Sequence, residues 1–177
     1  MPAFSIDISS PMPSGNTGTN GGPGSGGHVD PKNWYIQFGM DLSGPVGTKV
    51  FAAFDGHVTT FHPHVKSDDK PKVYGAQIFV RSGNNMMGGF YQHITAVPAA
   101  IKSGASISRG DLLGEVFIIP GSGMPPHLHW ALVEIIGGAP GGRYVGVDLH
   151  TTLLGIANTA TVLTVTFNQD GTPPTTT

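Results

Sequence analysis

Two histidines at alternate positions, His127 and His129, are the residues of this sequence whose spacing most suggests chemistry. In an extended strand, residues two apart point to the same face, so the two imidazoles would project side by side. Such a pair can share one metal ion, or one ring can bind the metal while the other acts as an acid or base. The alternative is that both are half-buried histidines of an ordinary strand.

Asp41 supplies a carboxylate that could complete such a site, at the end of an alternating stretch over 35–42. Gln37 lies four residues earlier and shares the face of Asp41 if the stretch is extended, with Gly39 leaving space between them. Carboxylate and imidazole together form a ligand set that zinc accepts. Asp41 could also be a turn or capping residue at the strand end, and His93 is either a further site residue or an edge histidine with a solvated ring.

The remaining histidines indicate no site. His57, His62 and His64 flank a polar loop, and His150 precedes a threonine pair near an expected helix start. The His62-Pro63-His64 stretch has alternate spacing, but a proline breaks the strand that would align the two rings.

Composition limits the class of protein. The chain has 177 residues, which suits one domain, and only 11% are charged with a net charge of −2, which excludes the electrostatic pattern of nucleic-acid or anionic-membrane binding. There is no cysteine, so a metal site must use His, Asp, Glu or an amide oxygen. No apolar run approaches the ~20 residues that span a bilayer. We expect no signal peptide in the first ten residues, and nothing in the pattern indicates an oligomeric state.

Short alternating stretches bounded by glycine and proline predict a mainly β fold of antiparallel sheets with little helix. We expect a Gly/Ser/Pro-rich N-terminal extension over 1–27 with a short edge strand near its start, a single β domain over 28–168, and a Pro/Thr-rich tail over 169–177. One short helix is expected over 148–156. The expected strands are 35–42, 48–54, 56–61, 73–81, 89–95, 106–114, 115–119, 127–136 and 159–167.

Five stretches, in order, resemble the M23 peptidase family, the lysostaphin- or LytM-like zinc endopeptidases of peptidoglycan. The resemblance extends over about residues 35–155, with Val147-Asp148-Leu149 similar to the closing segment of the family. The five stretches are Gln37–Leu42, Gly47–Val58, Tyr91–Ile94, Gly104–Gly114 and Pro126–Trp130.

The resemblance implies a tetrahedral zinc ion held by a histidine and an aspartate four residues apart and by the second histidine of the alternate pair. Asp41 and His129 take two of these positions, and Gln37 stands where the family has the first histidine. His127 and His93 would then orient and deprotonate the attacking water, and Tyr91 would contact the substrate.

Gln37 is a departure from the family pattern, because a neutral amide oxygen is a weaker zinc donor than imidazole. Either Gln37 coordinates through its amide oxygen, or His28 folds in from the glycine-rich approach. The resemblance therefore implies a cell-wall-directed zinc endopeptidase that cleaves short cross-bridge or stem peptides. The alternatives are a catalytically impaired LytM-like module that binds cell-wall peptide, glycan or a protein partner, and a β-sandwich with incidental histidines.

Overall fold

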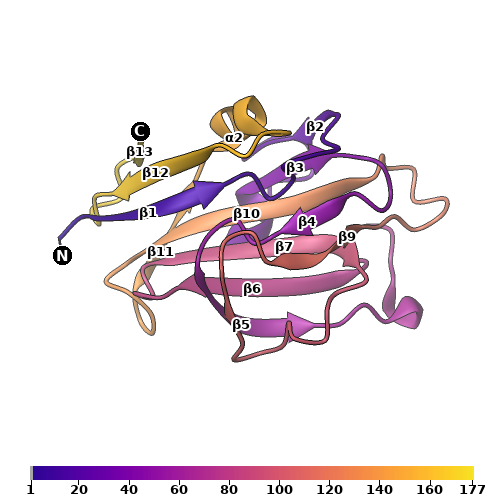
Figure 1. Cartoon of the computed structure of the whole chain (residues 1–177), viewed down its shortest axis with the longest axis horizontal. Helices are drawn as coiled ribbons and strands as arrows, with labels where there is room; N and C mark the ends of the chain where they lie inside the picture. The colour runs from indigo at the N-terminus through magenta and orange to yellow at the C-terminus, as the bar shows by residue number, and fades with distance from the viewer. Residues whose placement is uncertain (1) are drawn as a thin grey trace.

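The computed structural model describes residues 2–177, and it is built mainly from antiparallel β-strands with few helices, as the sequence predicts. Ten strands form one sheet with the path β2-β3-β10-β7-β6-β5-β8, and three others form the small sheet β1-β12-β13 (Figure 1). The elements are β1 (Phe4–Ser9), β2 (Gly18–Gly21), α1 (Trp34–Gln37), β3 (Gly39–Ser43), β4 (Lys49–Phe51), β5 (Gly56–His62), η1 (Lys66–Asp68), β6 (Ala76–Ser82), β7 (Met87–Thr95), β8 (Ser106–Ile107), β9 (Leu112–Val116), β10 (His127–Ile136), β11 (Arg143–Val147), α2 (His150–Ile156), β12 (Val162–Phe167) and β13 (Thr175–Thr176).

Strand β10 is the centre of the large sheet and has the bounds that the sequence predicts. It pairs with β7 along one edge, while its other edge pairs first with β3 and then with β11. Figure 1 shows β10, β7, β6 and β5 running side by side across the molecule, with β1, β12 and α2 beyond β10. Nine of its ten residues are buried, because one face carries the site and the other packs into the core.

Strands β6 and β7 form the hairpin expected around residues 82–85. Asn85 adopts a φ of 58°, and its N–H donates to the Ser82 carbonyl at 2.9 Å. Asparagine tolerates this left-handed conformation, which a tight hairpin turn requires. The hairpin brings β6 and β7 into register beside β10.

The hydrophobic core lies on the face of the large sheet opposite the site. Trp130 of β10 and Tyr91 of β7 are fully buried there and stack with ring centroids 6.0 Å apart. Burying a large apolar side chain stabilises the fold by about 1.5–3 kcal/mol, so this layer is what holds the site-bearing strands in place.

The short edge strand expected near the start of the N-terminal extension is β1, which pairs along its whole length with β12. The rest of the extension differs from the loop that its glycine and proline content suggests, because β2 pairs with β3 at the edge of the large sheet. Ile8 and Met12 are fully buried in the core. The tail also differs, because β13 adds a short strand to β12. The glycine and proline content suggested loops, but tertiary pairing decides these edge strands.

The stretch predicted as a strand over 35–42 divides into α1 and β3. The Asn33 carbonyl accepts the N–H groups of Ile36 and Gln37, both at 2.9 Å, which closes one helical turn. Asp30 starts this turn by accepting the Lys32 N–H at 2.9 Å. Extended structure therefore begins only at Gly39. Among residues 2–177, no helix is long and apolar enough to cross a membrane.

Candidate metal centre

Asp41 and His129 meet because they are direct cross-strand partners on β3 and β10. His129 Nδ1 lies 3.1 Å from Asp41 Oδ1. His127, two residues earlier on the same face, places Nε2 3.6 Å from Asp41 Oδ2. The alternate spacing of the two histidines therefore brings both rings to one carboxylate, as the strand geometry predicts.

His28 also belongs to this cluster. It comes from the loop between β2 and α1, and only 4% of the residue is exposed. Its Nε2 lies 3.2 Å from Asp41 Oδ1 and 3.3 Å from His129 Nδ1. His28, Asp41 and His129 thus offer three potential ligand atoms, all within 4.8 Å of one another.

The structure does not bring Gln37 into the cluster, which corrects the position expected for the third ligand. Gln37 is the last residue of α1, and its backbone carbonyl accepts the Gly24 N–H at 3.0 Å. In the described part of the chain, no hydrogen bond joins its side chain to Asp41 or His129. The expectation required an extended chain from 37 to 41, and the helical turn removes the shared face.

His93 reaches the site through a β-bulge. Gln92 pairs with Gln77 and Ile94 pairs with Ala76, so His93 has no partner on β6. Its φ of 68° is unusual for a residue with a side chain. A bulge re-aims a side chain, and the His93 ring lies with its centroid 4.8 Å from that of His127.

Backbone carbonyls fix the protonation pattern of His28 and His129. His28 Nδ1 lies 3.1 Å from the Gly22 carbonyl, and His129 Nε2 lies 2.7 Å from the Tyr35 carbonyl. A carbonyl oxygen only accepts, so these two nitrogens carry the protons and donate. In the neutral rings, His28 Nε2 and His129 Nδ1 then present lone pairs to Asp41.

The same pattern holds for the other two histidines. His127 Nδ1 donates to the Pro125 carbonyl at 2.8 Å, and His93 Nδ1 donates to the Tyr74 carbonyl at 3.3 Å. Each neutral ring therefore keeps Nε2 as an unprotonated acceptor. This arrangement suits proton uptake, because the base is oriented and its lone pair is free.

Charge and burial act in opposite directions on this cluster. Burial alone would raise the pKa of Asp41, but in the metal-free protein a second proton on His129 or His28 lies on the nitrogen that faces this carboxylate. The hydrogen bonds and positive charge of the protonated imidazoles then outweigh burial and hold the pKa of Asp41 well below its usual range. Burial lowers the pKa of His28, whereas its hydrogen bond to Asp41 and the charge of that carboxylate raise it, and the net direction is upward. Burial, together with His127 and His129, holds the pKa of His93 well below its usual value, so this ring stays neutral.

These residues fit a divalent zinc ion. A carboxylate oxygen and two imidazole lone pairs lie 3.1–3.3 Å from one another, and such acceptors repel unless a cation or proton lies among them. Three protein ligands of this type are also the usual set of a catalytic zinc site. Gly39 makes the approach possible, since a Cβ there would lie 2.2 Å from His129 Cε1 and 2.6 Å from His28 Cδ2.

Tyr91 does not line the site, contrary to the expectation that it contacts substrate. Its ring is fully buried in the core, and its hydroxyl accepts the Ala53 N–H at 3.0 Å. Burial raises its pKa, so the phenol stays protonated. Its neighbours on β7 alternate between the two faces, which places Tyr91 on the core side.

Tyr74 is a site neighbour that sequence reasoning missed. Its ring stacks on His93 with centroids 3.9 Å apart, and its buried hydroxyl has no hydrogen-bond partner within residues 2–177. Burial and the charges of Asp41 and Asp69 raise the pKa of Tyr74 to about 12. A Tyr-Gly pair just before a strand is the only local signal. The carbonyls of Gly22 and Tyr35 belong to the backbone, so no residue type in the sequence indicates that they bind the site histidines.

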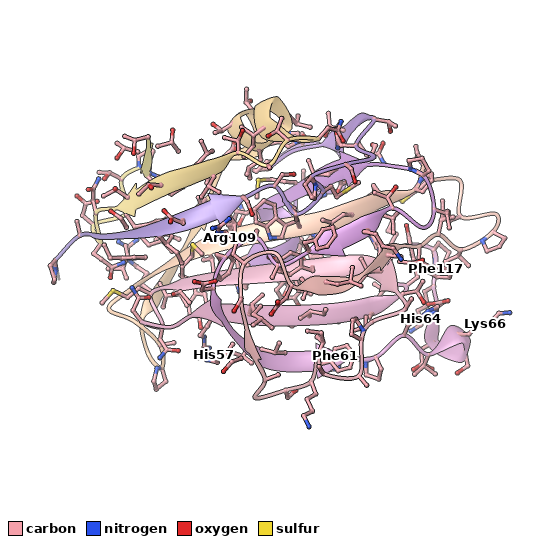
Figure 2. All side chains as sticks on the ribbon, in the orientation of Figure 1. His57, Phe61, His64, Lys66, Arg109 and Phe117 are labelled. Atoms are coloured by element: carbon pink, nitrogen blue, oxygen red, sulfur yellow. The ribbon has the colours of Figure 1, made fainter. Side chains whose placement is uncertain are left out.

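The histidines expected to be outside the site are outside it. His150 contacts Thr19 at 2.8 Å, and His64 lies 2.9 Å from both Asp69 and Thr95. Figure 2 shows His64, Lys66 and Phe117 at one end of the sheet and His57 away from them on β5.

A family model described as Peptidase family M23 matches residues 35–143, which is more than half of the chain. This chain belongs to peptidase family M23. The matched range includes Asp41, His93, His127 and His129, whereas His28 precedes it. No curated protein matches the sequence.

Solved structures show the same fold. The antimicrobial peptidase lysostaphin from Staphylococcus simulans is 17% identical, with a TM-score of 0.58 over 88% of this chain and 56% of that one. The NMR solution structure of lysostaphin is 18% identical, with a TM-score of 0.55 over 84% of this chain and 54% of that one. The catalytic domain of the S. simulans protein is 19% identical, with a TM-score of 0.50 over 79% and 89%. This chain therefore spans about half the length of lysostaphin.

Proposed function

We propose that this member of family M23 is a zinc-dependent endopeptidase that hydrolyses short peptides of peptidoglycan. The observation that carries the proposal is the convergence of His28 Nε2, His129 Nδ1 and Asp41 Oδ1 within 3.3 Å of one another. Both imidazole nitrogens are turned inward by carbonyl acceptors on the far side of each ring. Such outer partners are a regular feature of metal-binding histidines.

His28, Asp41 and His129 would hold the zinc ion. When bound, zinc supplies a Lewis acid that polarises a peptide carbonyl and makes water reactive near neutral pH. His127 then takes up the proton of the attacking water at Nε2, because its Nδ1 is occupied by the Pro125 carbonyl. His93 stays neutral next to it, and its unprotonated Nε2 can accept a second hydrogen bond from water.

Family membership supports the substrate class, and we propose a cell-wall peptide as the partner of the site. The same membership supports a location outside the cell or at the cell wall.

The alternative of a catalytically impaired binding module depended on Gln37 as a weak ligand. His28 weakens that reason, because it adds a second imidazole to the cluster of possible ligands. The two functions still differ in one measurable property, since a binding module needs no metal.

The test is metal content per chain after equilibration with micromolar zinc, followed by hydrolysis of glycine- and alanine-containing cell-wall peptides. We expect about one zinc per chain and cleavage that a chelator abolishes. Asp41→Asn is the matched control, because it keeps the shape of the side chain and removes its charge. Stoichiometric zinc without cleavage, or cleavage that survives chelation, would contradict the proposal.

A further inference from the structure

A second site lies on the same face of the sheet as the metal centre. A cavity of about 320 Å³ opens between β5, β6, β11 and α1. Its wall includes the aromatic rings of Trp34, Phe79 and Tyr144, with Arg81 and Thr60 beside them. Neither the match to family M23 nor the metal centre assigns a role to this cavity.

Register places the cavity at a defined distance from the metal centre. His129 and Val133 are four residues apart on β10 and face the same side, which corresponds to about 14 Å along the strand. Val133 lies opposite Gly88 on β7, and Gly88 lies opposite Arg81 on β6. Arg81 also lies two strands across from β10, about 10 Å away, so an extended peptide of about five residues spans the two places. A group in the cavity and a peptide bond at the metal centre can therefore belong to one substrate.

The wall of the cavity combines three aromatic rings with a guanidinium and a hydroxyl. The Trp34 ring lies 6.3 Å from that of Tyr144 and 6.4 Å from that of Phe79, so the rings line the cavity at different angles. Such apolar rings pack against the C–H face of a pyranose, and hydrophobic walls with a few placed polar groups are usual in ligand sites. The Tyr144 hydroxyl accepts a hydrogen bond from Arg81 Nη2 at 3.1 Å, which orients the guanidinium. Its remaining donors, with the Thr60 hydroxyl, suit hydroxyl and acetamido oxygens.

The charge of the lining residues restricts the class of ligand further. In the part of the chain that the structure describes, Arg81 is the only fixed charge among the lining residues, and no carboxylate lines the cavity. Tyr35 packs on Phe79 and Phe90, with centroids 5.3 and 5.0 Å from theirs, and so separates the cavity from the metal centre. The two compartments can therefore hold chemically different parts of one molecule.

We propose that this cavity binds an N-acetylated pyranose of the glycan strand, so that the preferred substrate is a peptide still attached to its sugar. The inference rests on the proposed function, because the peptide bond of the same substrate would lie at the metal centre. The inference predicts that stem peptides linked to the glycan are better substrates than free cross-bridge peptides.

Intrinsic fluorescence offers a direct test, since the chain has two tryptophans and Trp130 is fully buried. Titration of the full chain with a tetramer of N-acetylglucosamine should give a saturable change that arises from Trp34. Tyr144→Ala should weaken binding about tenfold through loss of an aromatic wall. Val162→Ala is the matched control, because Val162 and Tyr144 are both 41% exposed and Val162 lies outside the cavity. It should bind as the parent does.

No saturable change with the tetramer would overturn the inference, and so would a response to tetra-alanine without one to the sugar. Trp34→Phe should abolish the fluorescence change, and a change that persists would place the sugar elsewhere. The same titration with the His129→Ala variant separates the two proposals. Sugar binding without hydrolysis in the parent protein contradicts the proposed function alone, whereas hydrolysis without sugar binding contradicts this inference alone.

Discussion

Two groups in this molecule are built from aspartate and histidine, but only the group at Asp41 is arranged to bind a metal ion. In the group around Asp41, His28 and His129 each donate a hydrogen bond to a backbone carbonyl from the ring N–H that faces away from the carboxylate. The other nitrogen of each ring presents a lone pair to the carboxylate. At Asp69, His64 Nε2 lies 2.9 Å from the carboxylate, and its Nδ1 lies 2.9 Å from the Thr95 hydroxyl.

The second group is complete without a metal. The carboxylate of Asp69 requires a donor from His64, and the hydroxyl of Thr95 can donate to the other nitrogen. Asp69 also accepts the Gly75 N–H at 3.0 Å, so the group fastens the loop after β5 to the start of β6. The difference shows that a metal centre needs unprotonated ring nitrogens that converge on one point. The presence of aspartate and histidine alone does not provide this arrangement.

The largest expected difference between the two groups is in metal binding. His129→Ala should abolish bound zinc and hydrolysis, because it removes one ligand and leaves Asp41 with one fewer partner. His64→Ala should keep stoichiometric zinc. Metal analysis after dialysis measures both variants, and equal metal loss in the two would erase the distinction between the groups.

Replacing His28 should lower zinc affinity by at least about 10- to 100-fold, since even outer-sphere losses have effects of that size. Gln37→Ala should leave the affinity unchanged. Competition with a chromophoric zinc chelator measures both. If Gln37→Ala loses metal and His28→Ala does not, the ligand assignment made from the tertiary structure is wrong.

His127→Ala should keep the metal and lower the rate of hydrolysis about 10²- to 10⁴-fold, the usual contribution of a general base. The ring lies 3.6 Å from Asp41 and belongs to the proton-transfer side of the site. Parallel zinc analysis and peptide hydrolysis check this prediction. Loss of metal in this variant would make His127 a ligand instead.

The smallest expected effect concerns pH and the metal-free protein. The pKa of His28 is raised above 6.5 in the folded state. The folded protein therefore binds the proton that makes this imidazole cationic more tightly than the unfolded chain does. The resulting stabilisation is complete below about pH 6.5 and is lost as the pH rises through the folded pKa. Urea unfolding in the presence of a chelator should therefore show a stability difference from His28→Gln that shrinks between pH 5.5 and 8.5 (about three pH units). A constant difference would contradict the charge coupling to Asp41.

Much of the fold and part of the site follow from local sequence. The alternation of His127 and His129 on a long apolar stretch determines that both rings share one face of β10, because strand geometry has a period of two. The Ser82–Asn85 turn sets the β6-β7 hairpin in the same way. Family M23 is likewise recognisable from residues 35–143, which contain four of the five site residues named above.

Only the tertiary structure decided the third ligand position and the bulge at His93. His28 directly follows a glycine-rich segment, and such a flexible approach has many conformations until β2 pairs with β3. The turn of α1 then moves Gln37 away and brings the Tyr35 carbonyl to His129. Backbone carbonyls orient these rings, and a carbonyl is present at every residue. The sequence therefore determines the ligand types, whereas packing determines which of them meet and which nitrogen each one presents.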